Sequence, residues 1–467
     1  MSMSSHMHAG GGAPGATGSF ARFALAVHDF PALARSRALD AIADCTACMI
    51  AGADEPLAAP LLAVVAAADQ PDPRFDALIV GQQRFATPAE AALVNGTLAH
   101  ALDYDDTNHP AYAHPSAVLV PALLALAPHT QATGAALIDA YIVGFEIFGK
   151  LGRAMNTQHY KRGWHATGTF GALAAVAAAG RLLGLSQAQM VMAVGIAASS
   201  ASGLRANFGS MVKPLHAGLA ARNGVLAALL AREGFDASEV AMEHRYGYLQ
   251  VFNDGVGHDA APLAALGQDL EILTEHGLAL KPYPACGATH PGIEAALALR
   301  AEIGEAEIRA VEARVCEMSF APLIHVMPNS PLEGKFSLHY CLAAALVFGE
   351  LDLRSFSAGK IADPRVRSLI ERTEVKLDER WRDDGEFSTE VVVHTEDGRC
   401  LARHVPLAMG KPARWFSEER LRAKFDDCAR SLSASVRAPL WQALRSLDGA
   451  PSASALLTAL AECRVQH

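Results

Sequence analysis

Between residues 20 and 265, hydrophobic positions recur three and four residues apart, the spacing of one face of an α-helix. This part of the chain is rich in alanine and is punctuated by glycine and proline. Thr87-Pro88-Ala89-Glu90 has the pattern of a capping box with proline at the first helical position, and predicts a helix to about Leu102. Similar signals predict helices over 187–199 and 214–233. We therefore expect a large all-helical domain over residues 20–265.

The pattern changes past residue 265, where charge increases and β-branched residues alternate with others over 308–318, 374–377 and 390–394. Glu396-Asp397-Gly398 separates two such runs and predicts a β-hairpin. Helical patterns lie between the strands, at 291–303, 335–348 and 418–428. The fold class that these patterns predict is mainly α, with a smaller α+β lid domain over 266–431. Two last helices, near 434–447 and 452–463, could belong to either domain, and residues 432–467 could complete the helical one.

The composition narrows the class of protein. Hydrophobic residues make up 51% of the 467 residues and charged residues 19%, which excludes a mainly disordered chain. A net charge of −10 leaves no overall basic field for nucleic acid. No apolar stretch reaches the length of a membrane span, so we expect no membrane partner. Residues 1–19 lack the basic and apolar regions of a signal peptide and predict a disordered tail.

The eight cysteines are scattered, mostly within apolar periodic segments, which is typical of a reduced, cytoplasmic protein. Cys45 and Cys48 form a C-x-x-C within a helical run, without a second pair or the context of a redox motif. We interpret them as a packed pair in the core.

Several of the nineteen histidines lie beside proline or glycine at predicted helix ends. In the segment over 99–116, a helix ends and is followed by Asp103, Asp105 and Asp106, and then by His109 and His114. A histidine just before a helix faces the positive end of the helix dipole, which disfavours its charged form and suits proton transfer near neutral pH. An Asx-rich loop that caps two helices explains the same cluster. The spacing matches no compact metal-binding motif, and we expect no metal.

Two further segments place chemistry at helix starts. His165 lies in Gly163-Trp164-His165-Ala166-Thr167-Gly168, where it could also be a simple capping histidine. Lys213 directly precedes Pro214, so we expect it at the N-terminal end of a helix, beside free backbone amides. A helix N-terminus with a lysine predicts a carboxylate or phosphate site, although an exposed lysine is the alternative.

The segment over 281–291, KPYPACGATHP, joins the two parts of the chain. His290 precedes the helix opened by Pro291, which repeats the arrangement of His114. Cys286 could be a nucleophile, but no Cys-His-Asn signature surrounds it, and a buried structural thiol is the simpler interpretation.

These segments together resemble the MmgE/PrpD family, which includes 2-methylcitrate dehydratase, cis-aconitate decarboxylase and iminodisuccinate epimerase. The resemblance spans about Phe20 to Phe425. It rests on the motifs NGTLAHALDYDDT, AHPSA, GWHATGTFGA, KPLHAG, KPYPACGATHPGIEA and KFSLHYC. The lid segment KPYPACGATHP is more similar to the MmgE-like and epimerase-like members than to the methylcitrate dehydratases.

The resemblance implies a helical domain with an α+β lid, a homodimer, and catalysis without a metal or an organic cofactor. It implies a lyase that acts on a small di- or tricarboxylate, in the manner of a 2-methylcitrate dehydratase or a cis-aconitate decarboxylase. The alternative is an isomerase that epimerises a dicarboxylate such as iminodisuccinate. The family's active-site residues match five positions of this chain: Asp103, His114, His165, Lys213 and His290.

Each of these reactions develops negative charge next to a carboxylate. We expect Lys213 and the first amides of its helix to bind a substrate carboxylate and stabilise that charge. His165 or His114 would act as general acid or base, Asp103 would orient a histidine, and His290 would act from the lid. We also expect His216 and His109 to contact the substrate. A protein that only binds a small acid, and a metal enzyme, are the remaining alternatives.

Overall fold

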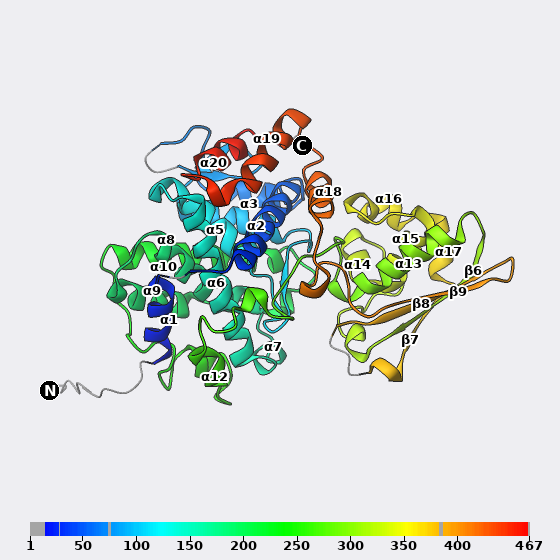
Figure 1. Ribbon diagram of the computed structural model, residues 1–467, viewed down its shortest axis with the longest axis horizontal. Helices are drawn as coiled ribbons and strands as arrows, with labels where there is room; N and C mark the ends of the chain where they lie inside the picture. The colour runs from blue at the N-terminus through cyan, green and yellow to red at the C-terminus, as the bar shows by residue number, and fades with distance from the viewer. Residues whose placement is uncertain (1–14, 28, 73–75, 383–385, 466–467) are drawn as a thin grey trace.

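The computed structural model describes residues 15–27, 29–72, 76–382 and 386–465. It consists of a large helical body and a smaller domain beside it, in which helices cover a β-sheet (Figure 1). We call these the body and the lid domain. The predicted fold class, mainly α with a smaller α+β domain, is confirmed.

The body contains these helices: α1 (Ala16–Leu25), α2 (Ala32–Gly52), α3 (Ala58–Val64), α4 (Pro88–His100), α5 (Ser116–Thr130), α6 (Gly134–Met155), α7 (Gln158–Lys161), α8 (Ala166–Leu182), α9 (Gln187–Ser200), α10 (Val212–Arg232), α11 (Tyr248–Val251), α12 (Ala260–Ala264), α18 (Glu418–Cys428), α19 (Ala434–Arg445) and α20 (Ser454–Ala461). Its short strands are β1 (Ala67–Ala68), β2 (Ala77–Ile79), β3 (Arg84–Ala86), β4 (Thr107–Asn108) and β5 (Leu278–Ala279).

The lid domain contains α13 (His290–Ile303), α14 (Pro331–Lys335), α15 (Leu338–Phe348), α16 (Ala358–Ile361), α17 (Pro364–Ile370), β6 (Ile308–Val315), β7 (Thr373–Leu377), β8 (Thr389–Thr395) and β9 (Cys400–Val405). Its sheet has the order β7-β6-β8-β9, in which β6 and β7 are parallel and the other pairs are antiparallel. The predicted hairpin joins β8 to β9, and Gly398 at its turn has a φ of 88°. Gly398 takes this left-handed conformation without the steric cost of a Cβ.

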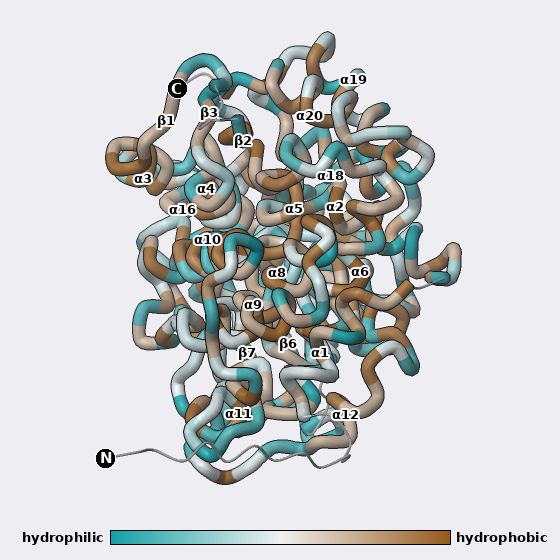
Figure 2. The backbone as a smooth tube through the Cα atoms, turned by 90° about the vertical axis from the view of Figure 1, so that its left-hand side faces the viewer, coloured by the Kyte–Doolittle hydropathy of each residue, from teal (hydrophilic) through white to brown (hydrophobic). Residues whose placement is uncertain are grey.

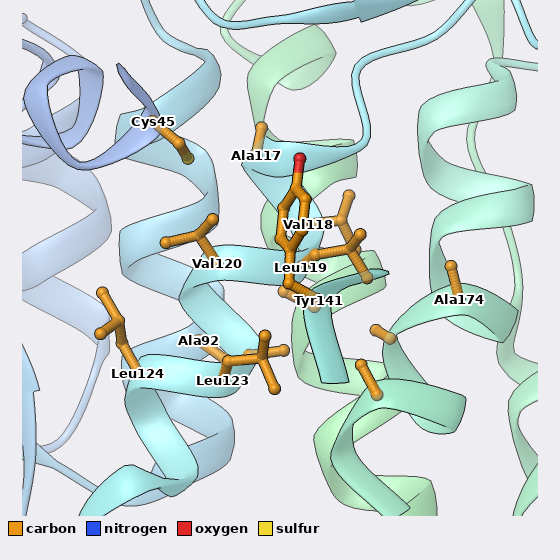
Figure 3. Packing of buried hydrophobic residues seen from close by; sticks show 14 of the residues in the cluster. Cys45, Ala92, Ala117, Val118, Leu119, Val120, Leu123, Leu124, Tyr141 and Ala174 are labelled. Carbon is orange, nitrogen blue, oxygen red and sulfur yellow. The ribbon is translucent and has the colours of Figure 1, made fainter. Parts of the chain in front are cut away.

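The core of the body lies where α4, α5, α8 and α10 pack together, and brown segments of α2, α5 and α8 gather there in Figure 2. Figure 3 shows buried side chains of α5, among them Leu119 and Leu123, packed beside Tyr141 of α6. Small residues let the backbones approach closely. A Cβ at Gly218 of α10 would lie 2.2 Å from the Leu93 carbonyl oxygen of α4. This close packing holds the ends of the four helices in fixed positions.

The chain passes between the body and the lid domain twice, and the two crossings lie side by side. The Leu280 amide donates a hydrogen bond to the Gly410 carbonyl at 3.0 Å. Gly410 has a φ of 91°, and a Cβ there would lie 2.0 Å from the Leu280 oxygen. Only glycine fits this position, where the two crossings touch.

The helix signals in the sequence correspond to observed helices with small shifts. Thr87 caps α4 by accepting a hydrogen bond from the Glu90 amide at 3.3 Å, and Ser186 and Gln189 form the complete capping box of α9. The predicted helix over 335–348 is interrupted: α14 ends at Lys335, and Ser337 caps α15.

The structure corrects two domain boundaries. Residues 1–14 of the predicted tail lie outside the described residues, but α1 begins at Ala16, and the Thr17 hydroxyl donates to Glu243 at 2.6 Å. This contact spans 226 positions, so no local pattern reveals it. Leu421 and Phe425 of α18 pack in the core of the body, so the chain returns to the body before residue 431.

In the part of the chain that the structure describes, none of the helices combines the length and the apolar character needed to span a bilayer.

Lys424 of α18 provides a test of how the last helices are held. Its ammonium lies 2.6 Å from an Asp44 oxygen of α2, and both side chains are fully buried. Lys424→Met would leave the Asp44 charge buried without a partner, and should lower the free energy of unfolding by about 3–5 kcal/mol. Urea denaturation measures this loss. The exposed Lys161→Met should change the stability by less than about 0.5 kcal/mol, and an equal effect of both variants would contradict the role of the ion pair.

Candidate active site

A cavity of about 690 Å³ lies between the body and the lid domain. All five residues expected to be catalytic line the cavity, although they come from four separate segments of the sequence: Asp103, His114, His165, Lys213 and His290. His109, expected to contact the substrate, also lines it. His216 does not line the cavity; it lies behind His165.

Asp103 lies in the turn that follows α4, in a conformation unusual for aspartate. Its φ is 54°, in the left-handed region, which costs energy for a residue other than glycine. Three lysine ammoniums hold this turn by donating to successive backbone carbonyls: Lys335 to Leu102 at 2.6 Å, Lys281 to Asp103 at 2.8 Å and Lys424 to Tyr104 at 2.7 Å. We call these three residues the lysine clamp. The clamp stabilises the turn and aims the Asp103 carboxylate at the cavity.

The Asp103 carboxylate is paired with two ammonium groups. Lys213 lies 2.6 Å from one oxygen and Lys281 lies 2.9 Å from the other. Burial alone would raise the pKa of Asp103, but attraction to Lys213 and Lys281 holds it well below its usual value. Burial would likewise lower the pKa of Lys213, but Asp103 raises it above its usual value. The site therefore holds a carboxylate anion with an ammonium cation on each side.

The three aspartates after α4 have separate roles. Asp105 lies 2.9 Å from the Nδ1 of the buried His100. Asp106 accepts hydrogen bonds from the amide and the hydroxyl of Ser116, at 3.0 and 2.8 Å, and so caps the start of α5. The alternative interpretation of the cluster as a helix cap thus describes Asp106, whereas Asp103 faces the cavity.

His114 is held with a defined tautomer when it is neutral. Its Nδ1 lies 2.8 Å from the Asp106 carbonyl oxygen, which can only accept, so Nδ1 carries the hydrogen. Its Nε2 is then unprotonated and lies 3.9 Å from Asp103. Burial lowers the pKa of His114 well below its usual value, so the ring is neutral near pH 7. His114 can therefore accept a proton.

His165 is the N-cap residue of α8, and its Nδ1 lies 3.0 Å from the Nδ1 of His216. One of these nitrogens donates and the other accepts, so the tautomer of His216 decides whether the Nε2 of His165 carries a hydrogen. Burial lowers the pKa of His165 well below its usual value, and the nearby His100 and Lys213 lower it further. His165 and His216 are thus a coupled pair, of which only His165 lines the cavity.

The lid domain contributes His290, the first residue of α13. Its Nε2 donates to the Ala285 carbonyl at 3.0 Å, which leaves Nδ1 as the unprotonated nitrogen. Burial lowers the pKa of His290 to about 3. Cys286 lines the same wall, but burial raises the pKa of its thiol, the opposite of what an activated nucleophile requires.

The sequence interpretation placed Lys213 beside free amides at a helix start, and this is wrong in detail. α10 begins two residues earlier than predicted, at Val212, and its first amides are already occupied. The Val212 amide donates to the Ser210 hydroxyl at 3.3 Å, and the Lys213 amide to the Ser210 carbonyl at 3.2 Å. The cationic side chains, and not these backbone amides, are available to an anion.

Two groups of side chains approach the spacing of a metal site. In the first, His100, Asp105 and His114, both Nδ1 atoms take part in the hydrogen bonds described above. The second consists of His109, His276 and Glu386. Here the Lys411 ammonium lies 2.8 Å from Glu386, which in turn accepts from His276 at 2.7 Å. Hydrogen bonds and ion pairs among these residues thus account for most of the donor atoms of both groups.

Sequence reasoning did not select the residues of the lysine clamp or His100. Lys281 and Lys335 are the first residues of two motifs that carry the family resemblance, KPYPACGATHP and KFSLHYC. Their position in these motifs could have marked them as candidate site residues. His100 also lies in a quoted motif; its ring centroid is 4.4 Å from that of His114 and 5.9 Å from that of His165. Lys424 had no comparable signal, because a lysine in a charged helix is usually exposed.

Comparison with known proteins agrees with this arrangement. The profile of the MmgE/PrpD N-terminal domain matches residues 19–260, and that of the C-terminal domain matches residues 283–446. The chain belongs to the MmgE/PrpD family. Of the five residues expected to be catalytic, four lie within the match to the N-terminal domain, and His290 lies within the match to the C-terminal domain. The cavity therefore lies where the two domains of the family meet.

Several relatives in this family are named as decarboxylases. The chain is 30% identical to a cis-aconitate decarboxylase-like protein of Aspergillus oryzae over 435 residues, which cover 88% of this chain and 89% of the relative. It is 30% identical to cis-aconitate decarboxylase of Aspergillus terreus, over 88% of each chain. The human cis-aconitate decarboxylase is 29% identical, over 80% of this chain and 79% of the relative.

His290 gives the protein a predictable dependence on pH. The pKa of His290 is about 3 in the folded state and about 6.5 in the unfolded state. Between these two pH values the unfolded chain binds a proton at His290 that the folded chain does not. The stability that depends on a neutral His290 is therefore complete above pH 6.5 and is lost as the pH falls. In His290→Gln, the slope of unfolding free energy against pH should decrease by up to about 1.4 kcal/mol per pH unit between pH 6.5 and 4.5.

Urea denaturation at several pH values measures both slopes. The exposed His244→Gln serves as the control and should keep the wild-type slope. Equal slopes for wild type and His290→Gln would show that His290 is not held neutral.

Proposed function

We propose that this protein is a lyase that decarboxylates a small tricarboxylate of the cis-aconitate type, using its own side chains without a metal or an organic cofactor. The observation that carries this proposal is the meeting of cations and neutral imidazoles in one cavity. Lys213 and Lys281 flank Asp103, and His114, His165 and His290 line the same cavity. Relatives that match most of the chain support the choice of substrate class.

The cations have the task of stabilising developing negative charge. When the C–C bond to the departing carboxylate breaks, carbon dioxide leaves and the electron pair remains on the substrate carbon, next to a second carboxylate. An ammonium group placed before the reaction, in a largely buried site, stabilises that charge without reorganisation. Lys213 and Lys281 are held in place by Asp103, which fixes their direction and raises the pKa of Lys213.

The histidines have the task of supplying the proton that the carbon then needs. His165 can donate from Nε2 when its Nδ1 accepts from His216. The hydrogen between the two Nδ1 atoms can then pass to His165, and His216 takes up a proton from solvent at its own Nε2, so that both rings end neutral. His114, with Nε2 unprotonated, can accept a proton and later return it. His290 would act on the substrate from the side of the lid domain.

Dehydration of a 2-methylcitrate-like acid uses the same groups, with an acid directed at the departing hydroxyl. Epimerisation of a dicarboxylate such as iminodisuccinate uses proton donors on opposite faces of one carbon. We propose these as the second and third reactions, because the cavity has imidazoles on both the body and the lid sides.

We further propose that the protein is a cytoplasmic homodimer. The family resemblance supports the dimer, and the eight cysteines, none of which forms a disulfide, support a reducing compartment. Size-exclusion chromatography with light scattering measures the number of subunits.

Lys213→Ala and His165→Ala should each lower turnover by at least about 100-fold, because each removes a charge-stabilising or proton-transferring group. Proton NMR in heavy water, with cis-aconitate, 2-methylcitrate and iminodisuccinate as substrates, measures the rate and the product together. Lys161→Ala and His244→Ala change the same residue types at exposed positions and should retain wild-type rates. Near-normal turnover in both test variants would contradict the assignment.

The same spectra distinguish the three reactions. Decarboxylation gives a product with one carboxylate fewer and deuterium on carbon, dehydration gives a new double bond, and epimerisation gives recovered acid that carries deuterium. Activity that is lost on dialysis against a chelator and restored by a metal would overturn the cofactor-independent mechanism.

A further inference from the structure

Arg205 lines the same cavity, and neither the sequence motifs nor the mechanism above uses it. It lies in the short 3-10 helix over Arg205–Asn207, between α9 and α10. The Arg205 amide donates a hydrogen bond to the Gly163 carbonyl at 2.8 Å. The same two backbone segments are joined by a second hydrogen bond, from the His165 amide to the Gly203 carbonyl at 2.9 Å. The backbone that positions His165 therefore positions Arg205 as well.

The guanidinium of Arg205 is held from one side. Nη1 donates to the Tyr160 carbonyl at 2.8 Å, and Cζ lies 3.7 Å from the centroid of the Tyr160 ring. Stacking on an aromatic ring and one hydrogen bond together fix the plane of the guanidinium. The direction of the group is thus set before any ligand binds.

The opposite edge of this guanidinium has no partner among the described residues. Nε is buried and makes no hydrogen bond, and within the described residues the hydrogen bonds of this guanidinium go to Tyr160 alone. A buried donor without an acceptor is costly and calls for an explanation. The Nε and Nη2 hydrogens of arginine point in parallel and match the two oxygens of one carboxylate. The free edge of Arg205 therefore has the geometry of a carboxylate site.

The other cations that line the cavity are each paired with a carboxylate of the protein. Lys213 and Lys281 are paired with Asp103, and Lys411 is paired with Glu386. Within the described part of the chain, no carboxylate lies at ion-pair distance from Arg205. Its charge is therefore available to a ligand.

Arg205, Lys213 and His165 lie around a single ring, that of Phe208. The centroid of Phe208 is 5.8 Å from the Arg205 Cζ, 5.6 Å from the Lys213 Nζ and 4.9 Å from the centroid of His165. One small acid with carboxylates a few bonds apart can thus reach both cations, with its carbon chain beside the Phe208 ring.

We propose that Arg205 binds a second carboxylate of the substrate, through Nε and Nη2, while Lys213 and Lys281 bind the carboxylate next to the reacting carbon. This inference rests on the proposed function and narrows it: the substrate carries at least two carboxylates, and Arg205 selects against acids with only one.

Binding of non-reacting acids tests the inference separately from catalysis. Tricarballylate, a saturated tricarboxylate, can occupy both positions, whereas butyrate can occupy only one. Arg205→Gln should weaken tricarballylate binding by about 10- to 100-fold, the range for hydrogen bonds to a charged group, and should leave butyrate binding unchanged. Isothermal titration measures the first, and ligand-observed NMR measures the second. Arg205→Lys keeps the charge without the paired donors, and should give an intermediate affinity.

Arg162→Gln provides the matched control, because Arg162 is exposed and pairs with Asp254 on the surface. It should bind both acids as the wild type does. If the wild type binds tricarballylate and Arg205→Gln binds it equally well, the inference is wrong. Weakening of tricarballylate and butyrate by the same factor would also overturn it. If Arg205→Gln does not fold, wild-type affinity in Arg205→Lys would overturn it as well. Failure of the wild type to bind any polycarboxylate would instead contradict the proposed function.

Discussion

The active site depends on the way buried ammonium groups hold one turn of the backbone. Lys281, Lys335 and Lys424 donate to three successive carbonyls around Asp103, whose own backbone lies in an unfavourable conformation. Burying a charge is costly unless it is paired and hydrogen-bonded. Here the carbonyl dipoles, Asp103 and Asp44 provide that compensation. Each lysine comes from a different part of the chain, so the connecting segment, the lid domain and α18 all contribute to holding the turn.

This arrangement explains how cations and neutral imidazoles coexist in one small cavity. Burial lowers the pKa of the histidines, and the nearby ammoniums lower it further. The same ammoniums keep Asp103 ionised in spite of burial. One set of charges thus gives the cavity both its capacity to hold an anion and its uncharged bases. Burial lowers the pKa of Lys335 to about 8, so its hydrogen bond to the Leu102 carbonyl is sensitive to alkaline pH.

The local features of the fold could be predicted from the sequence, and the long-range ones could not. Helix caps and tight turns depend on residues only a few positions apart, so a local pattern predicts them. This is the case for the caps at Thr87 and Ser186 and for the hairpin turn at Gly398. The histidines among the candidate catalytic residues lie near proline or glycine at predicted helix ends, and the resemblance to the MmgE/PrpD family supplied the set of five. The clamp lysines are separated from the Asp103 turn by 178 to 320 positions, and lysine carries no mark of burial in a single sequence. Arg205 was missed because its distinguishing feature is an unpaired edge, which only coordinates reveal.

The paired crossings at Leu280 and Gly410 have a consequence for how such proteins diversify. Because both ends of the lid domain leave the body at one point, the lid is an insertion whose length and contents can vary without altering the packing of α4, α5, α8 and α10. The body supplies the cavity wall that carries Asp103, His114, His165 and Lys213, and the insertion supplies the facing wall with His290. Variation in the inserted module can thus reshape one wall of the cavity while the body keeps the wall that carries Asp103, His114, His165 and Lys213.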